Sequence, residues 1–355
     1  TVRGFDVRIN AAGHRHAAAR HGERHGNERH HCSANKKRER CGGAHSLRDA
    51  VQSLEDVWSH FRVEQVVQSS SLTMLRSGLH WMVSLLSAGW IAKPPRSLFD
   101  TTPLHRLLAR VVPLERIPAQ IAAGRLRALA VATTSYTTGQ AVAFFDGTDD
   151  IEDWHRVRRA GHRRQIDLDV LMASAAIPFI FPASSIDGSH YGDGAMRQLA
   201  PLSPAVHLGA NRVLVIGTRG NAAATPPTGA ITQAPPSPAH LLGFVLGSLF
   251  TDGLSIDLER LNQINRLIFA AGHTEHRPIR ATVIQPSVDP TVIAMKHERH
   301  MPRSIRTLLR TMGAYEARGG LLVSYLLFDK SYTCKLMAMG YADAHAQRAE
   351  IVPYL

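Results

Sequence analysis

The sequence predicts an α/β protein, and three observations support this prediction. Apolar segments with strand character occur at residues 125–134, 141–145, 212–217 and 278–285. Segments with helical spacing lie before, between and after them. The chain has 355 residues, 44% of them hydrophobic, which is enough to bury a sizeable core. Strands that alternate with helices are typical of a layered α/β architecture.

The first predicted elements are helical. Between residues 48 and 68 the apolar side chains recur at helical spacing, and more helix is expected through residue 86. Pro94 and Pro95 end this block because proline interrupts helical hydrogen bonding. Asp100 is expected to cap a further helix over residues 103–111, with Pro103 in its first turn.

The predicted strands follow. The segment 125–134 turns at Thr138-Gly139 and returns as the strand 141–145. A short helix over 171–176 stops before Pro178, and Asp187-Gly188 is typical of a hairpin turn. After the strand 212–217, a loop rich in Ala, Thr, Pro and Gly is expected over 219–239. The remaining elements are the strand 278–285 and helices at 240–268, 303–311, 320–328 and 341–349.

Residues 1–47 differ in composition from the rest of the chain. The first 50 residues hold nine Arg, two Lys and five acidic residues, which supplies half of the net charge of +12. Large apolar side chains are scarce there, so the segment is predicted to be disordered. An alternative is metal binding by His30, His31, Cys32, Cys41 and His45, although their spacing matches no standard zinc pattern.

Composition also bears on location and partners. The three cysteines cannot form a disulfide framework, so a reducing, cytoplasmic location is expected. No run of 18 apolar residues predicts a transmembrane helix, and no secretory signal is recognisable. The segment Leu79–Ala92, with Trp81 and Trp90, suits either an interfacial helix or a buried core helix. No nucleic-acid recognition motif is present, so we expect no nucleic-acid partner.

An ordered set of motifs carries the chemistry. Ala-Ser-Ala-Ala-Ile-Pro begins at residue 173, Phe181-Pro182 follows, and Tyr-Gly-Asp-Gly-Ala occupies 191–195. Pro-Leu-Ser-Pro-Ala at 201–205 then leads to the apolar strand 212–217. Taken in this order, the motifs resemble those of patatin-like phospholipases. The resemblance extends over roughly residues 50–355, and the segment 321–329 resembles a bacterial subgroup of these proteins.

The resemblance implies a lipid acyl hydrolase with a Ser-Asp dyad. A serine hydroxyl needs an adjacent base, and in this family the aspartate of the Asp-Gly-Ala/Gly turn acts as that base. Asp193 would therefore be the base, with Gly192, Gly194 and Ala195 shaping the turn that aims its carboxylate. The resemblance implies phospholipid or other fatty-acyl ester substrates, peripheral membrane contact and no cofactor. A solvated turn carboxylate is the alternative for Asp193.

Two elements of the family pattern are missing from the 355 residues. These are the glycine-rich oxyanion loop and the Gly-x-Ser-x-Gly elbow that carries the nucleophile. No nucleophile or oxyanion-hole residue can therefore be assigned, and impaired catalysis is expected. A non-catalytic remnant or lipid-surface scaffold is the alternative function. We also hypothesise that residues 1–47 are out of frame, since a one-base shift at Gly26–Arg29 is compatible with Gly-Thr-Ser-Ala.

Three further residues could be mistaken for catalytic groups. Ser174 lies in Ala-Ser-Ala-Ala rather than in an elbow, so it is interpreted as a helix-packing residue. His190 is interpreted as a surface turn residue, and His207 as a half-buried residue of the helix before the strand 212–217. No metal ligand is assigned.

The expected architecture is a three-layer α/β/α fold of the patatin type that is incomplete at its N-terminal side. The expected organisation comprises residues 1–47, a truncated patatin-like domain over 48–217, and a C-terminal α/β extension over 218–355 that packs on it.

Overall fold

The structure is a computed structural model that describes residues 47–68, 87, 90, 97–219, 235, 237–272, 276–315 and 320–354. The predictions for residues 1–46, including the metal-ligand alternative, lie outside these residues. So do most of the segment Leu79–Ala92 and most of the loop 219–239.

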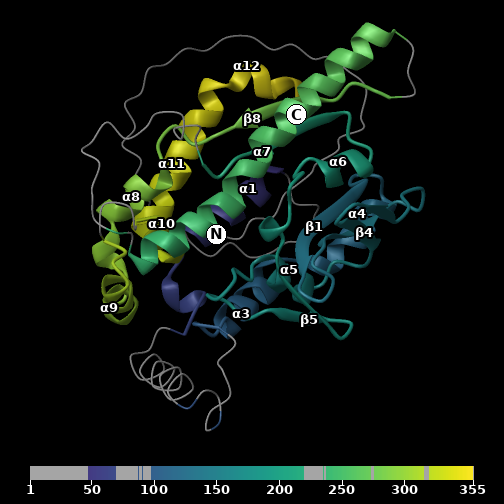
Figure 1. Ribbon diagram of the computed structural model, residues 1–355. Coiled ribbons are helices and arrows are strands. Elements are labelled where there is room, and N and C mark those ends of the chain that lie inside the picture. The colour runs from purple at the N-terminus through teal and green to yellow at the C-terminus, as the bar shows by residue number, and fades with distance from the viewer. Residues whose placement is uncertain are drawn as a thin grey trace.

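A six-stranded mixed sheet lies on one side of the molecule (Figure 1). Its strand order is β3-β4-β2-β1-β6-β5, with β2 and β4 parallel and the other neighbours antiparallel. The strands are β1 (Ala128–Ser135), β2 (Ala141–Gly147), β3 (Trp154–Arg156), β4 (Arg159–Arg163), β5 (Ser184–Ile186) and β6 (Ser189–Asp193). The hairpins predicted at Thr138-Gly139 and Asp187-Gly188 are both present, and Gly139 and Gly188 have positive φ angles.

Both faces of this sheet are covered, because apolar residues alternate on β1 and β2. Val131, Val142 and Phe144 face helix α5 (Leu168–Ser174), which contributes Val170 and Ala173. On the opposite face Ala130 and Phe145 pack with Trp154 and with Leu208, the residue after helix α6 (Ser203–His207). Helices therefore flank a mixed sheet, which confirms the predicted α/β class.

The strands β7 (Arg212–Ile216) and β8 (Arg280–Ile284) form a separate parallel pair. The sequence analysis predicted both strands but not their pairing, because an apolar strand carries no signal for its partner. The pair has its own core, in which Val213, Val215 and Ile279 contact residues of helix α7 (Pro238–Ala271). β7 thus pairs with a strand beyond residue 217, and the proposed boundary there remains a prediction.

The largest core cluster joins the start of the described chain to the C-terminal helices. Helix α1 (Leu47–Ser59) ends earlier than predicted because Phe61 turns inward. The centroid of its ring lies 4.8 Å from that of Trp58 and 5.8 Å from that of Phe328. The short helix η1 (Val63–Gln65) and helix α3 (Thr102–Val111) pack in the same cluster. The remaining elements here are α8 (Pro290–Lys296), η5 (Glu298–His300), α9 (Arg303–Thr311), α10 (Gly320–Leu326) and α11 (Lys330–Ala346).

Short helices complete the described chain. They are η2 (Leu114–Arg116), α4 (Ile117–Ala122), η3 (Gly194–Met196), α12 (Arg348–Ile351) and η6 (Val352–Tyr354). The predicted helix 341–349 is the end of α11 followed by α12. Two short strands, β3 and β4, were not predicted, because their arginine-rich sequence lacks an apolar alternation.

Helix α7 bears on the expectation that no transmembrane helix is present, which stays a prediction. Its 34 residues are long and apolar enough to cross a membrane, by length and composition alone. Small residues allow it to pack closely, however, since Gly243 and Gly247 lie against Leu321 of α10. Ala239 and Leu246 are buried in the main core. Helix α7 runs between the six-stranded sheet and the C-terminal helices (Figure 1).

Candidate active site

Asp193 is the last residue of β6 and is buried, with 9% of its surface exposed. Three hydrogen bonds hold this residue, two through its backbone and one through its side chain. The amide donates to the carbonyl of Ala176 at 3.0 Å, and the carbonyl accepts the hydroxyl of Thr134 at 2.8 Å. The side chain caps η3, because Oδ1 accepts the amide of Ala195 at 2.9 Å. The carboxylate is therefore fixed to the sheet, which a solvated turn residue would not be.

The two glycines beside Asp193 are required for packing rather than for an unusual backbone angle. A Cβ at Gly194 would collide with the backbone of Ala132 in β1. A Cβ at Gly192 would collide with the phenol ring of Tyr136. Both glycines thus let the segment around Asp193 approach β1 closely, and the predicted importance of Gly192 and Gly194 has this physical basis.

Tyr136 is a neighbour of the site that the sequence analysis missed. Its hydroxyl lies 3.5 Å from Sδ of Met196, and its backbone amide donates to the carbonyl of His190 at 2.9 Å. Partial burial raises the pKa of the Tyr136 phenol, and the charge of Asp193 raises it further. The phenol therefore stays protonated beside the carboxylate. The only sequence signal was its place directly after β1, opposite the strand that carries Asp193.

The sheet register shows which residues share a face with Asp193. Asp193 pairs with Thr133, and Thr133 pairs with Val142, so these side chains lie on the face that α5 covers. His190 is three residues from Asp193 along the strand and therefore points to the opposite face. Its exposed position agrees with its interpretation as a surface residue.

Ser174 and His207 also have structural surroundings. Ser174 is the last residue of α5 and is half-buried. The ring of His207 stacks on that of Trp154, with 4.8 Å between the ring centroids. Its Nδ1 atom lies 2.8 Å from the carbonyl oxygen of Ser203. Burial lowers the pKa of the His207 imidazole. The hydrogen bonds given above for Asp193 involve Ala176, Thr134 and Ala195, and neither Ser174 nor His207.

A Ser/His/Asp cluster lies at the start of α11, away from Asp193 in the sequence, and the sequence analysis did not find it. Nδ1 of His300 is 3.0 Å from Asp329 Oδ1 and 2.7 Å from Ser331 Oγ. A catalytic triad needs the serine and the carboxylate on different ring nitrogens. Here both contact the same nitrogen, and Asp329 also accepts the amide of Ser331 at 2.9 Å. The cluster is a helix cap rather than a nucleophile.

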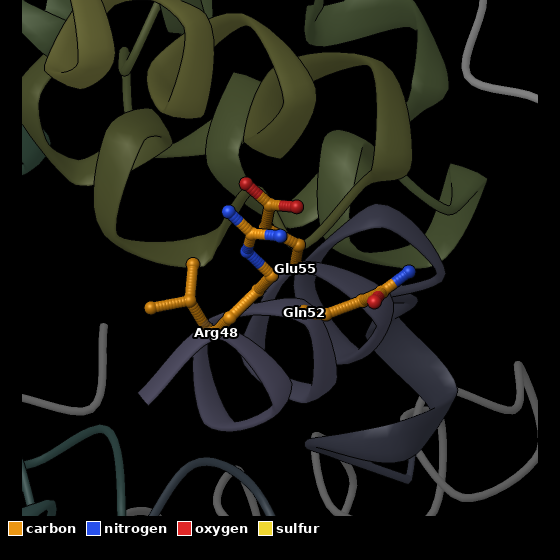
Figure 2. A pocket seen from close by; sticks show the side chains of 4 residues that line it. Arg48, Gln52 and Glu55 are labelled. Carbon is orange, nitrogen blue, oxygen red and sulfur yellow. The ribbon is translucent and has the colours of Figure 1, made fainter. Parts of the chain in front are cut away.

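Other places in the described chain do not supply the missing chemistry. A hollow of about 440 Å³ lies beside α1, lined by Arg48, Val51, Gln52 and Glu55. Figure 2 shows the side chains of Arg48 and Glu55 extending from α1 toward the C-terminal helices. None of the four described residues that line this hollow is a serine, cysteine or histidine. Among the described residues, no group of three His, Cys, Asp or Glu side chains is placed to hold a metal ion.

The fold and site together define an α/β protein with a buried aspartate held at the end of a strand by flanking glycines. A comparison with protein families matches residues 42–206 to the patatin-like phospholipase family. This match supports the resemblance to patatin-like phospholipases that the motifs indicated. The match includes the whole six-stranded sheet and Asp193. No curated protein and no solved structure matched the chain.

Proposed function

We propose that Asp193 is the catalytic base of a lipid acyl hydrolase and that this chain is catalytically impaired. The match of residues 42–206 to the patatin-like phospholipase family supports lipid acyl hydrolysis as the chemistry and lipids as the substrate class. The observation that carries the assignment of Asp193 is its rigid attachment at the end of β6. The Ala195 amide donates to the carboxylate, while the Thr134 hydroxyl donates to the backbone carbonyl of Asp193 and Gly194 packs closely against β1. A general base needs such a fixed position.

The mechanism begins with transfer of a proton from a serine hydroxyl to the carboxylate of Asp193. The serine oxygen attacks the ester carbonyl, the protonated Asp193 gives its proton to the departing alcohol, and an acyl-enzyme and a free carboxylate remain. Water then hydrolyses the acyl-enzyme with the same carboxylate as base. The scheme uses a serine and an aspartate and no cofactor; this chain supplies the aspartate, Asp193, and its serine is unassigned. Tyr136, protonated beside the carboxylate, would help to position it.

Impairment is proposed because the 355 residues contain no Gly-x-Ser-x-Gly elbow and no glycine-rich oxyanion loop. Removal of a serine nucleophile lowers turnover about a millionfold. The missing elbow also favours a second candidate function, a non-catalytic protein that binds lipid surfaces through the retained fold. We also propose a cytoplasmic protein, on the basis of its three cysteines, in peripheral contact with the membrane that holds its lipids.

The test is hydrolysis of a p-nitrophenyl fatty-acyl ester by the purified chain and by the variant Asp193→Asn. Asp187→Asn is a matched control, because Asp187 also precedes a glycine but lies in an exposed hairpin turn. Activity in the parent and in Asp187→Asn, together with its loss in Asp193→Asn, would support Asp193 as the base and reveal an unrecognised serine. Background rates in all three proteins would support the non-catalytic candidate. Equal activity in all three would refute the role of Asp193.

A further inference from the structure

The hairpin that joins β3 to β4 presents a basic tip. Residues 155–164 read His-Arg-Val-Arg-Arg-Ala-Gly-His-Arg-Arg. The last two arginines have structural roles, since Arg163 donates to the carbonyls of Gly147 and Thr148, and Arg164 pairs with Asp167 and Asp187. In contrast, Arg156, Val157 and Arg158 are exposed at the turn, with 88% of the Val157 surface accessible. We call these three residues the hairpin tip.

Arg158 adopts a backbone conformation that costs free energy. Its φ angle is +59°, in the left-handed region where glycine or asparagine is favoured. A two-residue hairpin turn of this kind normally has Gly or Asn at such a position. The chain instead places there a long cationic side chain that makes no described hydrogen bond. Such local strain is often found where a residue serves function rather than stability.

The charge of the hairpin tip is not neutralised locally. Among the described residues, no carboxylate pairs with Arg156 or Arg158, and Arg156 donates only to the carbonyl of its neighbour His155 at 2.9 Å. The acidic loop 149–153 lies at the other end of β3, away from the turn. The tip therefore combines two solvent-exposed cations with an exposed apolar side chain between them.

The sheet register relates the hairpin to the candidate active site. Ala160, the second residue of β4, lies in one row with Val142, Thr133 and Asp193. Three strand spacings of about 4.8 Å separate the backbones of Ala160 and Asp193, which are therefore about 14 Å apart. A surface bound by the tip would thus be held close to Asp193 by the rigid sheet.

We propose that the hairpin tip docks the protein on the surface of an anionic lipid bilayer. The two arginines bind lipid phosphates and carboxylates, and Val157 enters the boundary between headgroups and acyl chains. This inference rests on the proposed function, because it identifies the partner as the membrane that contains the lipid substrate. It assigns the contact to a part of the sheet for which the family resemblance makes no assignment.

Vesicle co-sedimentation tests the proposal without measuring catalysis. The parent is expected to bind vesicles of phosphatidylcholine and phosphatidylserine, to bind pure phosphatidylcholine weakly, and to be released by salt. Each arginine contributes about fivefold to such binding, so Arg156→Ala combined with Arg158→Ala should weaken it about thirtyfold. The matched control combines Arg106→Ala with Arg110→Ala on α3, where both side chains are also exposed, and it should bind like the parent.

Two single variants exclude trivial explanations. Arg158→Gly removes one charge and also relieves the backbone strain, so it should bind about fivefold more weakly while its melting temperature stays the same or rises. Unfolding could not then explain the weaker binding. Val157→Trp adds a fluorophore at the tip to the four tryptophans of the parent, so its emission is read as the difference from the parent. That difference should shift to shorter wavelength with anionic vesicles and remain unchanged with phosphatidylcholine alone.

Three results would overturn the proposal. The parent could fail to bind anionic vesicles, the tip and control variants could weaken binding equally, or the tip could bind a DNA or RNA duplex and not vesicles. Failure of the hydrolase function would be recognised separately. A parent that lacks esterase activity but docks through the tip would leave this inference intact, whereas an active parent that ignores anionic vesicles would refute only the docking.

Discussion

The phenol of Tyr136 occupies the space where a side chain at position 192 would stand. The glycine that precedes Asp193 is thus required by packing across two antiparallel strands, although the two residues are 56 positions apart in the sequence. Several expected outcomes depend on this and on comparable contacts.

Gly194→Ala should destabilise the protein more than Gly192→Ala. Its new methyl group would meet the backbone of Ala132, which cannot move without distorting β1, whereas the ring of Tyr136 can shift. Overpacking of this kind costs about 1–3 kcal/mol. Chemical denaturation should show a larger decrease in the free energy of unfolding for Gly194→Ala than for Gly192→Ala. Gly340→Ala is the control, since it lies within α11 with open space around it and should stabilise the helix by about 1 kcal/mol. Equal effects at 192 and 194 would contradict the packing argument.

Phe179→Gly should leave stability unchanged or increase it. Phe179 has a φ angle of +65° and 73% of its surface is exposed, so little burial would be lost. A left-handed conformation costs about 1–2 kcal/mol for a residue other than glycine. Phe179→Ala keeps that strain and should be less stable than Phe179→Gly. Thermal unfolding of the two variants would provide the comparison, and the reverse order would show that the aromatic ring makes a stabilising contact.

Asp257→Asn should preserve or raise stability at neutral pH. Asp257 of α7 accepts the backbone amide of Leu202 at 2.9 Å. Burial raises the pKa of its carboxyl group, partly offset by that hydrogen bond and by nearby Arg159 and Arg260. The folded pKa exceeds the unfolded value of about 3.9, so its favourable contribution is complete below that value and is lost as pH rises through the folded pKa. The parent should therefore gain stability on acidification relative to Asp257→Asn.

The hydrogen-bonding role of Asp257 can be separated from its charge. Asp257→Leu leaves the amide of Leu202 without its partner, and an unsatisfied buried amide costs about 1–3 kcal/mol. This variant should be clearly less stable than Asp257→Asn at every pH. If the leucine and asparagine variants were equally stable, the hydrogen bond between Asp257 of α7 and the amide of Leu202 would contribute nothing to stability.

Asp329 should show the opposite pH dependence. Burial acts to raise the pKa of its carboxyl group, but hydrogen bonds from Ser331 and His300 outweigh this and lower it. Its stabilisation is present above the unfolded pKa of about 3.9 and is lost as pH falls through the folded pKa. Asp329→Ala removes the cap of α11 and should cost about 1 kcal/mol at neutral pH. The difference in free energy of unfolding between the parent and Asp329→Ala should become smaller in acid. A difference that does not change with pH would contradict the pKa shift.

Much of the fold followed from local patterns. The strands β1 and β2, their turn at Gly139 and the hairpin at Asp187-Gly188 were predicted because apolar runs and turn residues act over a few positions. Helices α3 and α9 were predicted within one residue at each end, because their apolar spacing and proline positions are strong local signals. The arginine-rich β3 and β4 were missed because pairing with β2 overrides their weak strand propensity.

Asp193 was found from motif order, and its importance could be inferred because turn glycines leave a recognisable sequence. Tyr136 could not be found in this way, since nothing in a lone tyrosine indicates that it meets Gly192. The cluster of His300, Asp329 and Ser331 likewise depends on contacts between segments 29 or more residues apart.

Short patterns of residue type were sufficient to predict the α/β class, the resemblance to patatin-like phospholipases and the position of Asp193 in an Asp-Gly-Ala turn. The tertiary structure alone decided that β7 and β8 leave the main sheet, that Gly192 and Gly194 serve close packing, and that Ala160 shares a row with Asp193. These relationships arise from strand pairing and side-chain packing between distant segments, for which local propensity carries no information.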